Sequence, residues 1–232
     1  MYALFPVIAA VIGAVIAVLR PPGPVIRSYI QHLAAGVVFS VVAVELLPDI
    51  IRQHSPVEVV IGFVLGVATM LGLRSLSHKL EKGNNGEPER PIGLLVGVGV
   101  DILLDGFLIG VSFAAGEKAG QLLTFALTLE LLSLGLAVAT ALGKTARNKW
   151  RVLLITFLLF QILLVGTGIG GLLIHYISPS VMEAVLSFGL AALMYLVTEE
   201  LLVEAHKEPE TPMATGMFFL GFLVFLILGI VK

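Results

Sequence analysis

The sequence predicts an all-α integral membrane protein that forms one transmembrane domain over residues 1–232. Three observations predict this class. Hydrophobic residues make up 58% of the chain and charged residues only 13%, whereas soluble domains contain about 25% charged residues. The mean hydropathy is strongly positive. The apolar residues also gather in segments near the roughly 20 residues that a helix needs to cross the hydrocarbon core.

Eight such segments can be marked, and we predict one transmembrane helix for each. In order, they run approximately over residues 2–19, 29–51, 57–74, 92–115, 121–142, 151–174, 181–203 and 213–231. The first lacks the basic n-region of a cleaved signal peptide, so it is predicted to be a span. Turn and charge signals follow several of the eight segments. RPPGP follows the first, GKTARNKWR the fifth and HKEPETP the seventh.

The distribution of Lys and Arg predicts the orientation of these helices. With the N-terminus outside, the inward loops hold eleven of the 14 basic residues, and the outward side holds only Arg52, Lys118 and Lys232. Basic residues favour the cytoplasmic side, so both termini are predicted to lie outside, in a multi-pass protein of the inner (plasma) membrane. The longest loop, 75–91, is polar with GNNG at its centre, and it is predicted to be a flexible cytoplasmic linker between the third and fourth helices.

The charge and the cysteine content exclude several kinds of partner and site. The net charge is −2, which argues against a nucleic-acid partner. The chain has no cysteine, so disulfides and thiolate metal sites are excluded. No signature of an intramembrane hydrolase, such as HExxH, is evident, and the protein is not expected to be an enzyme or to hold a prosthetic group. Seven glycines are predicted to permit close helix packing: Gly36, Gly62, Gly66, Gly72, Gly110, Gly166 and Gly170.

Acidic residues inside the predicted spans are the strongest functional signal. Asp101 and Asp105 are one helical turn apart in the fourth span, so both side chains share one helix face. No Lys or Arg is expected at comparable depth. An ionisable group inside a membrane is a functional-site hypothesis by default, and anions without a protein cation point to an imported cation. The acids in other spans are Glu45, Asp49, Glu130, Glu199 and Glu200.

Structural explanations compete with the functional one at several of these positions. Glu130 could be a protonated acid that is hydrogen-bonded to a neighbouring helix. Glu45 and Asp49 straddle Pro48 and could face water at the outer interface. Glu199 and Glu200 should point to different faces of their helix, so at most one is expected to face a given site.

Residues near the ends of the spans are expected to be solvated or interfacial. This group comprises Glu204, His206, His32 and His175. Histidine and cysteine, the usual ligands of Zn²⁺, are therefore absent at membrane depth, and carboxylate oxygens also suit Mg²⁺, Mn²⁺, Fe²⁺ and Ca²⁺. The chemistry of the ligands ranks zinc below manganese or iron.

At these residues the chain resembles the ZIP (Zrt/Irt-like) family of divalent metal transporters, particularly its short bacterial and archaeal branch. The string DILLDG at 101–106 is similar to the family's fourth-span motif H-N-x-P-E-G, and ELLSLGLAV at 130–138 is similar to its fifth-span motif. AAGVVFSVVAVELLPDI and GLAALMYLVTEELLVEAH resemble its second and seventh spans. The resemblance implies a ZIP-like helix bundle and a homodimer. It also implies that Asp101, Asp105 and Glu130 occupy ligand positions.

The chain also departs from the family pattern. Ile102, Leu131 and Leu134 stand where relatives have groups that build a second metal site, so at most one metal is predicted. Both motif prolines are lost, and no sixth-span carboxylate can be placed; Gln161 is the nearest polar residue. Ser133, three residues after Glu130, or water could complete one coordination sphere.

The sequence thus predicts a transporter for a divalent metal of the Zn, Mn, Fe or Cd class, with one site from Asp101, Asp105 and Glu130. Glu45 and Asp49 would attract cations at the outer mouth. Glu199, Glu200 and Glu204 would receive them towards the cytoplasm. Two alternatives stay open. One is a ZIP-fold membrane protein that binds or senses metal without transporting it, and the other is a proton-coupled carrier of a monovalent cation.

Overall fold

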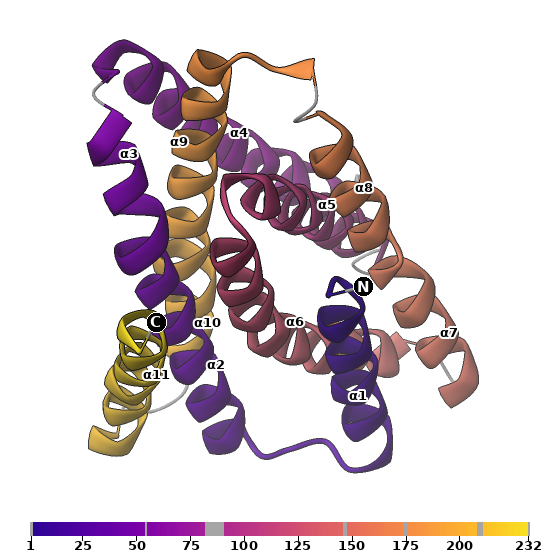
Figure 1. The fold of residues 1–232 in the computed structure, drawn as a ribbon. Helices are drawn as coiled ribbons and strands as arrows, with labels where there is room; N and C mark the ends of the chain where they lie inside the picture. The colour runs from indigo at the N-terminus through magenta and orange to yellow at the C-terminus, as the bar shows by residue number, and fades with distance from the viewer. Residues whose placement is uncertain are drawn as a thin grey trace.

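The computed structural model describes residues 2–53, 55–81, 91–145, 148–173, 176–207 and 211–231. These residues form helices and short connections, and there is no strand among them (Figure 1). In chain order, the helices are α1 (Leu4–Leu19), α2 (Pro24–Val41), η1 (Val42–Leu46), α3 (Leu47–Gln53), α4 (Pro56–Glu81), α5 (Pro91–Ala115), α6 (Glu117–Thr145), α7 (Lys149–Phe160), α8 (Ile162–Leu173), α9 (Pro179–Tyr195), η3 (Leu196–Leu201), α10 (Leu202–Ala205) and α11 (Pro212–Ile230).

Within the described residues, seven helical stretches are long and apolar enough to cross a membrane, so the predicted class of all-α multi-pass membrane protein is confirmed at that level. Three of them join consecutive elements: α2–η1–α3, α7–α8 and α9–η3–α10. The helix α1 is equally apolar but has only 16 residues. The remaining four are α4, α5, α6 and α11.

Local sequence signals set several helix boundaries. The helices α2, α9 and α11 begin with proline, whose missing N–H costs nothing in the first turn. The Thr211 hydroxyl accepts a hydrogen bond from the Ala214 amide, and the Asn148 side chain accepts one from the Trp150 amide. Pro48 cannot donate to a carbonyl one turn earlier, which accounts for the π-helical turn η1 just before it.

The predicted loop at 75–91 is shorter in the structure. The helix α4 continues without a break to Glu81, and α5 begins at Pro91. Residues 75–81 are therefore helical, and the rest of the predicted linker, 82–90, lies outside the described residues. The stretch SLSHKLE holds no proline or glycine that would end the helix earlier.

Glycine brings four pairs of helices into backbone contact. The pairs are α1 with α6, α5 with α8, α2 with α11, and α4 with α9. At each contact a Cβ added to a glycine would lie within 2.4 Å of a carbonyl oxygen on the facing helix, as it would at Gly13, Gly36, Gly62, Gly106, Gly110, Gly135, Gly166, Gly170 and Gly221. Five of the seven glycines predicted to permit close packing are in this list. Gly66 is a sixth, because a Cβ added there would lie 2.7 Å from the Phe188 carbonyl oxygen. Gly72 is the exception, since an added Cβ there would meet nothing within 4 Å.

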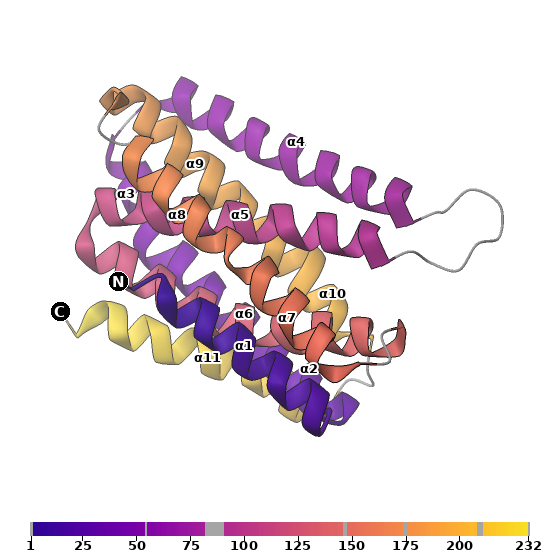
Figure 2. The same ribbon diagram turned by 90° about the vertical axis from the view of Figure 1, so that its right-hand side faces the viewer.

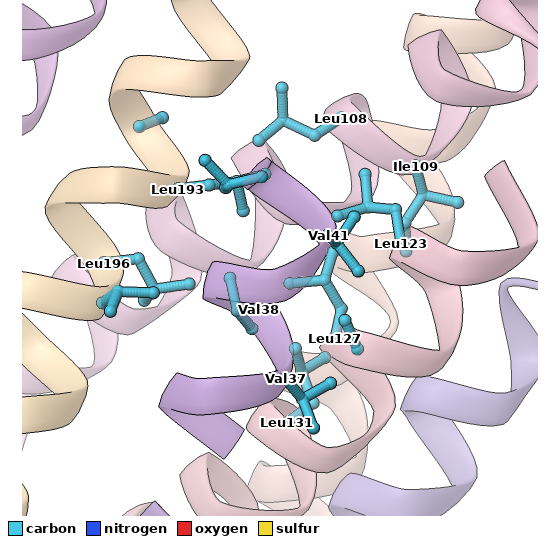
Figure 3. Packing of buried hydrophobic residues seen from close by; sticks show 14 of the residues in the cluster. Val37, Val38, Val41, Leu108, Ile109, Leu123, Leu127, Leu131, Leu193 and Leu196 are labelled. Carbon is cyan, nitrogen blue, oxygen red and sulfur yellow. The ribbon is translucent and has the colours of Figure 1, made fainter. Parts of the chain in front are cut away.

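The pairs assemble into two groups of helices. One contains α1, α5, α6 and α7–α8, and the other contains α2, α4, α9 and α11. The groups meet mainly where α2 packs on α6 and where α4 packs on α5. A buried apolar core fills the space between α2, α5, α6 and α9 (Figure 3). Val38 from α2, Leu127 from α6 and Leu193 from α9 are each 1% exposed or less.

Candidate metal centre

Three carboxylates from two neighbouring helices converge at the centre of the bundle. Asp101 and Asp105 lie on α5, Glu130 lies on α6, and an oxygen from each lies within 4.8 Å of the other two. We call these three residues the carboxylate cluster. Asp105 is 3% exposed and Glu130 is 1% exposed, while Asp101 is half-buried. The structure therefore brings together the three acids that the sequence grouped.

The carboxylate cluster leaves buried oxygen atoms without partners. Among the described residues, no hydrogen-bond donor reaches Oδ2 of Asp105 or Oε2 of Glu130. Leaving such an atom unsatisfied in the interior costs about 1–3 kcal/mol, and more for a charged group. Buried acids of this kind must be protonated or must accept a cation.

The apolar neighbours of the cluster pack into the core. Ile102 and Leu131 follow Asp101 and Glu130 directly, and both are completely buried. Neither side chain offers a ligand atom. Ser133 is also buried, at 7% exposed, and it lines the same cavity as Asp101 and Glu130.

Two cavities meet at Asp101. The α4-side cavity, about 240 Å³, lies between α4, α5 and η3, and its polar lining includes Arg74, Ser77 and Tyr195. The α2-side cavity, about 290 Å³, also reaches Glu130 and Ser133, and extends to Gln31, Glu204 and Lys207. Asp101 lines both, so the cluster is reached from the end of the bundle where α2 begins and α10 ends.

The opposite side of the cluster is closed. Beyond Asp105 there is a void of about 10 Å³ among Leu104, Leu108, Leu193 and Leu196. A second void of about 10 Å³ follows among Leu46, Leu108, Leu123 and Leu193. Neither exceeds the space that one water molecule needs, and both have mainly apolar walls. Tightly packed leucines therefore separate the cluster from the α3 end of the bundle.

Both Glu199 and Glu200 line the two cavities. The two residues lie in the π-helical segment η3. Glu199 is nearly half exposed and bonds Arg74, so a shared cavity lining does not decide which of the two glutamates faces the carboxylate cluster.

A cation lies at the depth where none was expected. The Arg74 side chain donates a hydrogen bond to the Glu199 carboxylate over 2.8 Å and another to the Tyr195 hydroxyl over 3.4 Å. Arg74 ends the predicted third span, and it was assigned to a loop. Because α4 continues past it, the side chain stays on the helix and lines the cavity that contains Asp101.

Glu45 and Asp49 lie away from the carboxylate cluster. The Glu45 carboxylate, 14% exposed, is 3.5 Å from the Lys118 ammonium, which also donates to the Gly229 carbonyl over 2.7 Å. Asp49 is half-buried on α3 and lines neither cavity that reaches Asp101. No sequence pattern linked Glu45 to Lys118, because the two residues belong to different spans.

Further polar groups were missed or misplaced from sequence. Gln31 is buried and lines the α2-side cavity, and an oxygen of Glu183 is buried without a hydrogen-bond partner among the described residues. Glu183 lies inside the predicted seventh span, two residues from its start, and the sequence analysis did not single it out. His32, expected to be solvated, is only 4% exposed. His175 lies outside the described residues.

The fold and the cluster define a multi-pass helical membrane protein with a buried acidic centre. No protein-family model matches the chain, and no curated protein matches it either. The resemblance to ZIP transporters therefore stays a prediction from the motifs in the sequence.

Proposed function

We propose that this chain is a transporter for divalent metal cations and that the carboxylate cluster holds the substrate ion. One observation supports this above all: three buried carboxylates from α5 and α6 converge within 4.8 Å. Among the described residues, no Lys or Arg forms an ion pair with any of them. Like charges repel at such distances, and a divalent cation bound through carboxylate oxygens would remove this repulsion.

The ligand set supports one ion of a hard or borderline metal. Three carboxylates with Ser133 or water would suit Mn²⁺ or Fe²⁺ better than Zn²⁺, which favours imidazole or thiolate. The apolar side chains of Ile102, Leu131 and Leu134 would provide no ligand for a second ion beside the first.

The route of the ion follows from the cavities. The cluster opens towards Gln31, Glu204 and Lys207, at the end that the positive-inside rule assigns to the cytoplasm. The leucines on the other side would close the outer path in this state. Incoming metal would be attracted by Asp49 and by Glu45, where it would displace the ammonium of Lys118. Glu199 and Glu200 would receive the ion on the inner side.

Alternating access would come from movement between the two groups of helices. The carboxylate cluster belongs entirely to the group of α1, α5, α6 and α7–α8, whereas Leu46 and Leu193 belong to the other group. The glycine contacts that bring backbones together lie within each pair of helices. The groups meet through side chains, so sliding or rocking of one group on the other would cost less than separating a pair.

The topology completes this proposal. The helix α1 would supply an eighth span, with both termini outside, in a protein of the plasma membrane. This is supported by the position of the chain ends, because α1 begins and α11 ends at the same end of the bundle (Figure 2). Because its second, fourth, fifth and seventh spans resemble those of ZIP transporters, we also propose that the chain is a divergent member of that family and forms a homodimer.

Flux assays in proteoliposomes test the function. Purified protein should move Mn²⁺, Fe²⁺, Zn²⁺ or Cd²⁺ into sealed vesicles, and Asp105→Asn should lower the flux at least tenfold, on the order of the loss that even outer-shell changes at metal sites cause. Glu117→Gln is the control, since Glu117 is exposed at the start of α6. Equal flux in wild type and Asp105→Asn would contradict the site.

Two other outcomes would favour the alternative functions. Metal binding by wild-type protein without any flux would indicate a binding or sensing protein. Suppression of Mn²⁺ flux by millimolar Na⁺ at fixed pH would indicate a carrier of monovalent cations.

A further inference from the structure

Two histidines that are far apart in the sequence meet beside residues that line the α2-side cavity. His32 lies on α2, and His206 ends α10. Their ring centroids are 5.1 Å apart, with an angle of 69° between the ring planes. Their sequence neighbours Gln31 and Lys207 line the cavity itself.

Each ring is oriented by a hydrogen bond within its own helix. Nδ1 of His32 lies 2.9 Å from the Ser28 carbonyl, and Nδ1 of His206 bonds the Leu202 carbonyl. A carbonyl can only accept, so the proton sits on Nδ1 in both neutral rings. The lone pair is then on Nε2, the tautomer in which histidine binds a metal while its other nitrogen donates to a carbonyl.

The helices that bear the two rings are held together next to them. The Ser28 hydroxyl donates a hydrogen bond to the Ala205 carbonyl over 3.0 Å, directly before His206. The Arg27 guanidinium lies 3.6 Å from the Glu204 carboxylate, which also bonds the Lys207 ammonium. Glu204 thus offsets positive charge that would otherwise oppose a metal ion at this place.

The spacing of the rings fits a shared metal ion. Two imidazoles bound to one tetrahedral ion, at metal–nitrogen distances of about 2.0–2.1 Å, place their ring centroids about 5 Å apart with the rings inclined to each other. The observed separation of 5.1 Å agrees with this geometry.

We infer that His32 and His206 form a second metal site, which binds a borderline transition-metal ion such as Cu²⁺, Ni²⁺, Co²⁺ or Zn²⁺ with water as the remaining ligands. Imidazole favours these ions, whereas the all-oxygen carboxylate cluster favours harder ones. The two sites therefore differ in preferred metal. A metal ion at the histidine pair joins α2 to α10 beside the α2-side cavity. The inference does not depend on transport.

Electron paramagnetic resonance of bound Cu²⁺ tests this site. Purified protein without a polyhistidine tag is mixed with one equivalent of Cu²⁺, and the nitrogen superhyperfine splitting is recorded. Wild type should show coupling to imidazole nitrogen. His32→Gln and His206→Gln should each lose this signal and weaken Cu²⁺ binding at least tenfold, on the order of the losses expected from damage to a metal site.

Matched variants make the test decisive. His54→Gln replaces a histidine that follows α3 and should keep the wild-type signal. Asp105→Asn should also keep it, which separates this site from the carboxylate cluster and from the proposed transport. His206 is exposed, so His206→Gln leaves the packing intact even if His32→Gln fails to fold. A nitrogen-coupled signal that survives in His206→Gln, or one that disappears in Asp105→Asn, would overturn the inference.

Discussion

Arg74 changes the electrostatics of the space next to the carboxylate cluster. It lines the same cavity as Asp101 and forms an ion pair with Glu199. Both side chains of this pair are nearly half exposed, at 47% and 45%. Pairs that accessible contribute little to folding, because water and salt screen them. The role of Arg74 is therefore to set the charge of the cavity more than to hold the fold.

Arg74→Gln should lower the maximal rate of metal flux in proteoliposomes while the midpoint of thermal unfolding changes little. The variant leaves Glu199 without its cation, so the cavity becomes more negative and releases a divalent cation more slowly. KM should stay unchanged or fall, because the same charge attracts the ion. Arg151→Gln, at an exposed position of α7, is the control and should leave both flux parameters unchanged. A higher maximal rate in Arg74→Gln would contradict this role.

The acids of the candidate site could be grouped from the sequence because few positions in the spans are charged. The four-residue spacing of Asp101 and Asp105 fixes their common face, and Glu130 stands out in an apolar segment. The partners of the outer acids could not be found in this way. Lys118 and Arg74 reach Glu45 and Glu199 across different helices, and these contacts depend on how the helices pack.

At the scale of helices, glycine determines which neighbours approach most closely. In α8, a Cβ at Gly166 would lie 2.2 Å from the Leu103 carbonyl oxygen of α5, and one at Gly170 would lie 2.3 Å from that of Phe107. A Cβ added to Gly168, on the same helix, would have no atom of another helix within 4 Å. One side of α8 is thus packed on α5 through its backbone, and another side is open.

Gly166→Ala should destabilise the protein, and Gly168→Ala should not. The first substitution forces α5 and α8 apart, and such overpacking costs about 1–3 kcal/mol. The second adds a methyl group in open space and improves helix propensity by up to about 1 kcal/mol. Thermal unfolding of the two variants in the same detergent measures the difference. Equal unfolding midpoints would show that the close contact of α5 with α8 is not required.

The helices themselves were largely predictable, and their details were not. Each predicted segment overlaps a helix of the structure. A long apolar segment in a membrane has few other ways to satisfy its backbone hydrogen-bonding groups. The end of α4 was placed too early, since polar residues such as those at 75–81 can remain helical beyond an apolar span. The π-helical segment η3 contains no proline or glycine, so the sequence gives no signal that predicts it.

At the scale of the whole molecule, the connections between helices divide into two sets at opposite ends. Trp150, 79% exposed at the start of α7, belongs to the end where α6 finishes and α10 ends. Tyr176, 86% exposed, lies between α8 and α9 in the chain. The end of α8 and the start of α9 lie at the other end of the bundle (Figure 2). The proposed topology assigns these ends to the cytoplasm and the outside.

Cysteine labelling tests this assignment directly, because the chain has no cysteine of its own. Tyr176→Cys should react with a membrane-impermeant maleimide added to intact cells. Trp150→Cys should react only after the membrane is made permeable. Both positions are highly exposed, so neither variant disturbs the packing. The reverse pattern would contradict the proposed orientation, and labelling of both positions from outside would show that α7–α8 does not cross the membrane.

Among the described residues, the three central acids form no ion pair with Lys or Arg, and this has a consequence for the membrane potential. With all three ionised, the empty centre carries three negative charges, and a bound divalent ion reduces this to one. Moving one elementary charge across the full field changes the free energy by about 2.3 kcal/mol per 100 mV. A step that carries the empty centre through the field is thus three times as sensitive to voltage as the same step with metal bound. Protons bound to the empty centre would lower its charge and so reduce this difference.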